Sequence, residues 1–199
     1  MSTPNKDLDK VEVRIKWDPS DQGEAPNDLD IIAATYPADE PYGSPAYLVH
    51  FDSRAPDGTI TLDRDSRTGQ GLGYDEVMTL ELDRLSDAYA RVVVGVAIQQ
   101  RDGRKTFDAI ENTGVQVREG YTTLSEDDFS AVGSATASVV AEFVRDESGG
   151  WHFHGSVRGF DGDPDLCPAA RGGGGAGGTA PLTGRAGRLR GHDPPALSA

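Results

Sequence analysis

The sequence predicts an all-β protein, an antiparallel β-sandwich with at most short helical turns. Many short segments alternate apolar and polar residues, which is typical of strands with one solvent-exposed face. Clusters of glycine, proline, asparagine and aspartate separate these segments, and almost no segment has helical periodicity. Neither a βαβ unit nor a repeat of about 20 to 50 residues is visible, which disfavours parallel α/β folds, propellers and solenoids.

Five segments in the first half of the chain have the character of strands. They are residues 11–17, 29–36, 47–51, 59–62 and 78–82. The first and last alternate in polarity, whereas the second is apolar on both faces, as expected of a central strand. The third and fourth flank a Pro-Asp-Gly turn at residues 56–58, so we expect them to pair with each other. The fourth and fifth flank a glycine-rich loop and would hold its ends.

The second half continues the pattern. The strand candidates are residues 92–98, 107–110, 115–117, 139–145 and 151–158. The first of these is β-branched and apolar on both faces, so it should be the most buried strand. The last two flank Asp146-Glu147-Ser148-Gly149-Gly150 and should form a terminal hairpin. Residues 125–128 begin like a capped helix, which predicts a helical turn or two there.

The composition divides the chain into three parts. Residues 1–10 are mostly polar and are predicted to be a flexible leader, and residues 11–165 are predicted to form the sandwich. Residues 166–199 are rich in glycine, alanine, proline and arginine, with few large apolar side chains. Because ordering such a segment would cost more entropy than burial could recover, we expect a disordered tail.

Composition also limits location and partners. The first residues contain no apolar run that would act as a secretory signal, so we expect a cytoplasmic protein. The longest apolar stretch, Val92 to Ile98, is far shorter than the roughly 20 residues that a membrane-spanning helix needs. A net charge of -14 disfavours nucleic acid and favours cations. Cys167 is the only cysteine, which excludes an intramolecular disulfide and a multi-cysteine zinc site.

The glycine-rich loop at residues 63–76 has the residue types of a calcium site. Glycine at every second position from Gly69 to Gly73 permits positive φ angles, so successive carbonyls can bend toward one centre. The carboxylates that would join them are Asp65, Asp75 and Glu76 at the loop and Asp28 and Asp30 upstream. Such an all-oxygen shell suits a hard cation such as calcium. The alternative is a solvated glycine-rich turn with surface acids.

Two other interpretations of the loop fit poorly. An EF-hand counted from Asp63 has Thr68 where its glycine belongs, and one counted from Asp65 has Gln70 there. A dinucleotide fingerprint needs a helix after the glycines, whereas residues 78–82 are predicted to be a strand. Asp75 and Glu76 also make a weak acid-base pair, because adjacent side chains of a strand point to opposite faces.

Several motifs occur in an order that resembles a known family. They are Trp17-Asp18, Asp28-Leu29-Asp30, the Pro-Asp-Gly turn within residues 53–58, and the loop from Asp65 to Glu76 with its following strand. The chain from residue 11 to 160 is similar to the TerD-like tellurium-resistance and stress proteins of bacteria, which are small calcium-binding β-sandwiches. The resemblance implies carboxylate ligands at Asp28, Asp30, Asp65, Asp75 and Glu76, with backbone oxygens around Thr68, Gly69 and Gly71.

These observations lead to a functional expectation. We expect a non-catalytic, calcium-binding stress-response protein that acts through a calcium-ordered surface for protein partners. A metal-independent protein-interaction module is the alternative, and it would not respond to calcium or EDTA. An enzyme that processes an oxyanion is the least favoured class, because no combination of nucleophile, base and orienting group stands out.

Overall fold

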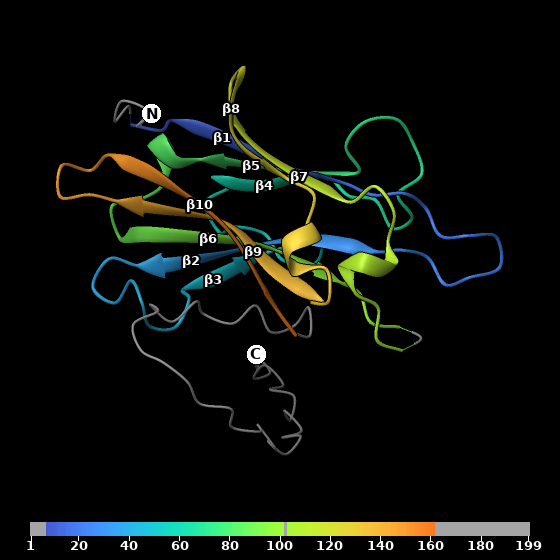
Figure 1. Ribbon diagram of the computed structural model, residues 1–199. Coiled ribbons are helices and arrows are strands. Elements are labelled where there is room, and N and C mark those ends of the chain that lie inside the picture. The colour runs from blue at the N-terminus through green and yellow to red at the C-terminus, as the bar shows by residue number, and fades with distance from the viewer. Residues whose placement is uncertain (1–6, 102, 162–199) are drawn as a thin grey trace, which may run out of the picture.

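Two antiparallel sheets of five strands each pack face to face in the computed structural model (Figure 1), which confirms the predicted fold class. The structure describes residues 7–101 and 103–161. The predicted disordered tail at 166–199 lies outside the described residues, as do residues 1–6 of the predicted leader. Within that leader, Leu8 is buried and its N–H donates to the Trp151 carbonyl at 3.2 Å.

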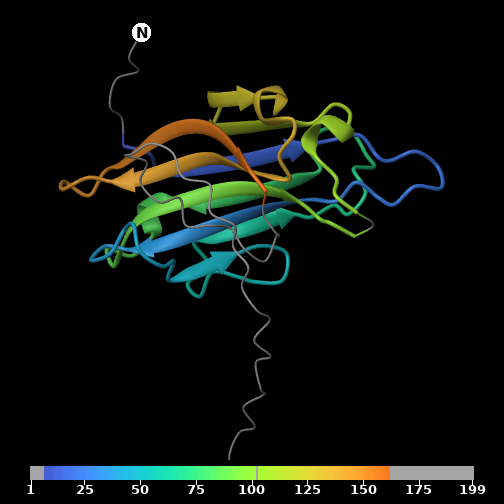
Figure 2. The same cartoon turned by 60° about the horizontal axis from the view of Figure 1, so that its bottom comes forward.

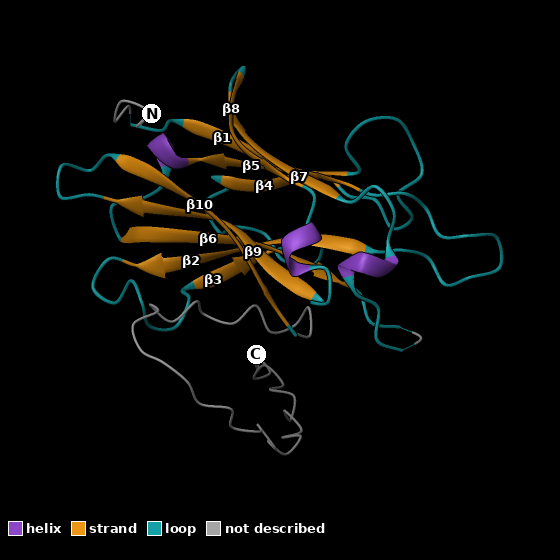
Figure 3. Ribbon diagram, in the orientation of Figure 1, coloured by secondary structure: helices purple, strands orange, loops and turns teal. Residues whose placement is uncertain are grey.

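Together the two sheets contain ten strands, and three short 3-10 segments lie in the connections between some of these strands (Figure 3). The first sheet has the order β4-β5-β1-β7-β8, and the second has the order β10-β9-β6-β2-β3. The strands are β1 (Lys10–Lys16), β2 (Leu29–Pro37), β3 (Tyr47–Val49), β4 (Ile60–Arg64), β5 (Glu76–Glu81), β6 (Tyr89–Ile98), β7 (Gly114–Glu119), β8 (Thr122–Asp127), β9 (Ala137–Arg145) and β10 (Trp151–Phe160). The 3-10 segments are η1 (Leu82–Arg84), η2 (Phe107–Ala109) and η3 (Ser130–Val132). Within the described ranges, no helix is long and apolar enough to cross a membrane.

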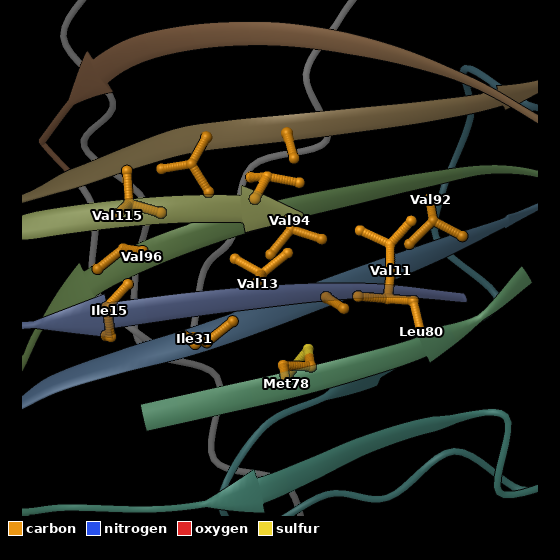
Figure 4. Packing of buried hydrophobic residues seen from close by; sticks show 14 of the residues in the cluster. Val11, Val13, Ile15, Ile31, Met78, Leu80, Val92, Val94, Val96 and Val115 are labelled. Atoms are coloured by element: carbon orange, nitrogen blue, oxygen red, sulfur yellow. The ribbon is translucent and has the colours of Figure 1, made fainter. Parts of the chain in front are cut away.

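The main core lies between the sheets. Alternate residues of β1, including Val11, Val13 and Ile15, point toward alternate residues of β6, including Val94 and Val96 (Figure 4). All five are at most 1% exposed. Burying each such side chain contributes about 1.5–3 kcal/mol, so the period-two pattern of the sequence supplies the driving force for sheet packing.

Strand β2 is buried on both faces, as its continuous apolar sequence predicts. Ile31 and Ala33 belong to the main core, whereas Ile32 and Ala34 belong to two small clusters on the opposite face. Phe160, at the end of β10, packs against both small clusters. The two layers can be followed in Figure 2, where β3 lies at one side of the molecule and β8 at the other.

The predicted pairing of residues 47–51 with residues 59–62 is wrong. Strand β3 pairs with β2 in the second sheet, whereas β4 pairs with β5 in the first sheet. The turn between them crosses from one layer to the other, so that Val49 and Ile60 both reach the main core. Turn residues specify a reversal of the chain, but burial decides which strands become partners.

Two local predictions are also wrong. Residues 107–109 form η2 instead of a strand, and this turn places Phe107 in the core, stacked on Phe129 at 4.3 Å between ring centroids. Residues 122–127 form β8 instead of a helix start, because pairing with β7 overrides the local capping pattern. Asp127 and Asp128 instead stabilise the turn that follows β8, since they accept the backbone N–H groups of Phe129 and Ser130, each two residues further on.

Candidate metal centre

Three loops gather at one end of the sandwich, and the candidate site lies where they meet two strands. In Figures 1 and 2, residues 18–28, 65–75, 99–101 and 103–106 extend from the same end of the molecule. Residues 18–28 lead into β2, residues 65–75 join β4 to β5, and residues 99–106 follow β6. The antiparallel pairing of β4 with β5 confirms that strands hold both ends of the glycine-rich loop.

Carboxylates from three of these elements converge at this end. Asp30 of β2, Asp65 of the loop and Glu76 of β5 each offer one oxygen, and these oxygens lie within 4.8 Å of one another. Asp30 and Glu76 are buried, whereas Asp65 is exposed. Glu76 is in step with Met78 and Leu80 along β5, so its side chain points between the sheets rather than to solvent. The convergence of Asp30 with the glycine-rich loop therefore connects the two sheets.

Glu76 makes only part of the hydrogen bonding that a buried carboxylate requires. Its Oε2 atom accepts the backbone N–H of Ile31 at 2.8 Å. Strand β3 pairs with β2 only from Ala33 to Thr35, so no third strand runs beside Ile31. The other oxygen, Oε1, is buried and no N–H or O–H group donates to it in the described structure. A buried oxygen without a donor, facing two other carboxylates, calls for either a proton or a cation.

The electrostatics of the cluster point in the same direction. The pKa of Glu76 is raised to about 10, chiefly by burial and also by Asp30 and Asp65, while the hydrogen bond from the Ile31 N–H lowers it. Burial also raises the pKa of Asp30 to about 6, against a hydrogen bond from Gln99 that lowers it. The site therefore disfavours three negative charges in the absence of a counter-charge. Either protons or a cation must neutralise it.

Asp28 lies at the edge of this cluster and is not one of the three converging residues. It is close enough to Asp65 and Asp30 for their charges to interact. Its Oδ2 atom lies 2.5 Å from Arg101 Nη2. Burial raises the pKa of Asp28, and the neighbouring guanidinium groups of Arg101 and Arg67 oppose that shift. Asp28 is thus adjacent to the predicted cation position but is already paired.

Asp75 is positioned differently from the other predicted ligands. Its Oδ2 atom accepts the N–H of Trp17 at 3.0 Å, and its own N–H donates to the Ile15 carbonyl at 2.8 Å. The Trp17 indole N–H in turn donates to the Asn27 carbonyl at 2.9 Å, next to Asp28. Asp75 and Glu76 therefore serve different neighbours, as adjacent residues at the start of a strand should.

The glycine-rich loop has the predicted backbone conformation. Gly69, Gly71 and Gly73 have φ angles of +65°, +146° and +90°. A Cβ atom on Gly69 would lie 2.6 Å from the Trp17 ring, so the loop can pack on this indole only with glycine there. Thr68 is half-buried, Gly69 is buried and Gly71 is exposed. The roles of their backbone oxygens as ligands stay predictions.

Two residues that sequence reasoning did not assign to the site contact it. Gln99 Nε2 donates to Asp30 Oδ2 at 2.5 Å, and Arg101 pairs with Asp28. Both follow β6, whose last residue, Ile98, pairs with the first residue of β2, Leu29. Only this long-range register brings Gln99 and Arg101 to the two upstream aspartates. The one signal in the sequence that could have indicated this contact is that Gln99, a polar residue, directly follows the buried strand β6.

The fold and the site together define the class of the protein: it is an antiparallel β-sandwich with a cluster of carboxylates at one end. The sequence profile of the TerD domain matches residues 1–167, and the chain belongs to the TerD family. Curated relatives include the tellurium resistance protein TerD of Alcaligenes sp, which is 25% identical over 171 residues covering 81% of this chain and 86% of that protein. The uncharacterized protein YceE of Bacillus subtilis (strain 168) is 26% identical over 173 residues, which cover 81% and 87% of the two chains.

Solved structures show closer relatives. A homologue of telluride resistance protein (TerD) from Streptomyces coelicolor A3(2) is 59% identical, with a TM-score of 0.78 over 79% of this chain and 94% of that one. A protein of unknown function, SAV2460, is 60% identical, with a TM-score of 0.79 over 80% and 94% of the two chains. The resemblance noted from the motifs is therefore confirmed across the sandwich.

Proposed function

We propose that this protein is a calcium-binding, non-catalytic stress-response protein of the tellurium-resistance type. Calcium would be held by Asp30, Asp65 and Glu76, with Asp28 and Asp75 at the margins of the site and backbone oxygens of Thr68, Gly69 and Gly71 completing the shell. The single observation that carries this proposal is the buried Oε1 atom of Glu76, which lacks a donor and faces two further carboxylates.

The donor set favours calcium over other common ions. The group of three contains only carboxylates, and neither histidine nor cysteine belongs to it among the described residues. Oxygen ligands suit calcium and magnesium, whereas zinc and copper favour nitrogen or sulfur. Ligands from a strand, a loop and a second strand form an irregular shell, which calcium tolerates better than octahedral magnesium.

Calcium at this position would order a surface rather than catalyse a reaction. Glu76 is fully buried and bound to the Ile31 N–H, so it is badly placed to exchange a proton with a substrate. An ion shared by Asp30 and Asp65 would instead tie β2 to the glycine-rich loop. We propose that the loop surface formed in this way contacts protein partners in the cytoplasm.

A metal-independent interaction module is the second candidate, and one observation favours it. Gly69 packs directly on Trp17, the residue after β1, so the glycine-rich loop is anchored there without an ion. Protons on Glu76 and Asp30 would then neutralise the cluster in place of calcium. Under this alternative, neither calcium nor EDTA changes the melting temperature.

Calcium titration of the full chain by calorimetry tests the proposal. We expect saturable binding that Asp65→Asn weakens at least ~10-fold, because one anionic oxygen donor becomes a neutral amide. Asp39→Asn is the matched control, since Asp39 is exposed on the loop after β2 and lies outside the carboxylate group. Absence of calcium binding, or equal binding by both variants, would overturn the proposed function.

A further inference from the structure

Arg101 places a positive charge against the candidate calcium site. Its Nη2 atom lies 2.5 Å from Asp28 Oδ2, and the Asp28 side chain is only 5% exposed. We infer that Arg101 is a built-in competitor of the divalent cation: it occupies Asp28 when the site holds no ion and thereby sets the affinity of the site. This inference rests on the proposed calcium-binding function and names the residue that tunes it.

Asp28 is held at a position where its carboxylate can pair with Arg101 or bind the divalent ion. The backbone N–H of Gln99 donates to the Asp28 carbonyl at 2.8 Å, and the next residue but one along β2, Asp30, is a member of the carboxylate group. The pairing of β2 with β6 ends at Leu29 and Ile98, and Arg101 follows three residues after Ile98, where its side chain reaches Asp28. The backbone at the negative end of this ion pair is therefore held by β6, and the charge of Asp28 interacts with those of Asp65 and Asp30.

The Arg101 side chain is more than half exposed to solvent. Its exposed fraction is 54%, and Asp28 is its one hydrogen-bond partner in the described part of the chain. Arg104, three residues on, is equally exposed but contacts both the Ser134 carbonyl and Asp161. Because a half-exposed arginine can exchange a carboxylate for water at little net cost, a divalent ion could displace Arg101 from Asp28.

The competition has a charge component and a ligand component. A guanidinium beside Asp28 repels a divalent ion at the neighbouring carboxylates, and it also occupies an oxygen that the ion would otherwise bind. Calcium would then release Arg101 toward an open cleft of about 370 Å³ that Gln99, Arg104 and Lys105 also line. Ion binding would thus alter the charge of the surface beside the site.

The experiment compares Arg101→Gln with Arg104→Gln in the full chain by calcium calorimetry. Each variant removes one positive charge from the same loop, so the pair separates a local effect from a change in net charge. We expect Arg101→Gln to bind calcium about 10-fold more tightly, equivalent to about 1.4 kcal/mol, and Arg104→Gln to change affinity less than ~3-fold. Equal tightening in both variants, or no tightening in Arg101→Gln, would overturn the inference.

A double-mutant cycle with Asp28→Asn tests the mechanism. The gain from Arg101→Gln should disappear in the Asp28→Asn background, because the competitor has then lost its anchor. A gain that persists undiminished means that Arg101 acts only through its long-range field, which contradicts competition for Asp28. The outcomes also separate the two proposals: calcium binding by the native chain with no effect of Arg101→Gln removes this inference alone, whereas no binding by any variant removes the proposed function.

Discussion

Glu76 on β5 reaches across the sandwich and accepts the backbone N–H of Ile31 on β2. One carboxylate oxygen therefore ties the first sheet to the second, while the other has no donor and faces Asp30 and Asp65. Glu76 therefore matters to both the fold and the proposed function. The same side chain joins the two sheets at the end of the core and would supply a ligand to calcium. Its chemistry can be changed without changing its shape.

Glu76→Gln should separate these two roles. Glutamine keeps an oxygen for the Ile31 N–H and places an amide N–H toward the carboxylates, so the metal-free protein should be at least as stable as the native chain. Calcium should no longer raise its melting temperature, whereas the native chain should gain about 2.7 kcal/mol in the free energy of unfolding at a calcium concentration of 100 times Kd. Thermal melts in calcium and in EDTA measure both effects. A native-size calcium shift in Glu76→Gln would exclude Glu76 as a ligand.

The stability of the metal-free protein should fall as pH rises. The folded-state pKa of Glu76 is about 10, well above the ordinary glutamate value, so the folded chain holds a proton that the unfolded chain has released. Stability is then lost from about pH 4.5 toward pH 10, by at most ~1.4 kcal/mol per pH unit for one proton. Asp30, with a pKa of about 6, adds to the loss below neutral pH.

Melts in EDTA between pH 6 and 8.5 measure this slope, and Glu76→Gln should flatten it. Calcium affinity should change in the opposite sense and rise with pH, because binding must expel the protons. Calorimetry in buffers of different ionisation enthalpy counts the protons released. An identical pH slope in Glu76→Gln would show that the titrating group lies elsewhere.

The sequence predicts much of this site because its residues lie in periodic segments. Glu76 keeps step with Met78 and Leu80, which alone indicates a side chain pointing into the core. Asp30 precedes a run that is buried on both faces, and the alternate glycines of the loop indicate its positive φ angles. Each of these inferences depends only on neighbours along the chain, where strand periodicity and glycine stereochemistry are reliable guides.

Other features depend on pairing between distant segments. Arg101 and Gln99 reach the site because Leu29 pairs with Ile98, a register that local patterns do not encode. For the same reason the strand at residues 47–49 joined the second sheet instead of the partner suggested by its turn. Local chemistry specifies turns and faces, whereas the choice among apolar partners depends on packing of the whole sandwich.

Asp75→Asn should affect folding more than calcium binding. The Asp75 carboxylate accepts the Trp17 N–H, and its side chain is buried. An asparagine keeps the acceptor but loses the charge assistance, so we expect a loss of about 1 kcal/mol in the free energy of unfolding. Calcium affinity should change less than ~3-fold, in contrast to Asp65→Asn. Denaturant titration and calorimetry measure the two quantities, and a loss of affinity comparable to Asp65→Asn would make Asp75 a direct ligand.

Gly69→Ala should disrupt the glycine-rich loop through Trp17. The new methyl group would lie 2.6 Å from the indole ring at a residue whose φ is +65°. Gly73→Ala is the matched control, because Gly73 also has a positive φ, of +90°, but its methyl group would meet nothing within 4 Å. Both variants bear a backbone cost of about 1 kcal/mol, and Gly69→Ala should cost at least ~1 kcal/mol more through the clash. Urea unfolding followed by tryptophan fluorescence measures the difference, and calcium affinity should weaken in Gly69→Ala alone. Equal destabilisation of the two variants would show that the loop does not depend on its contact with Trp17.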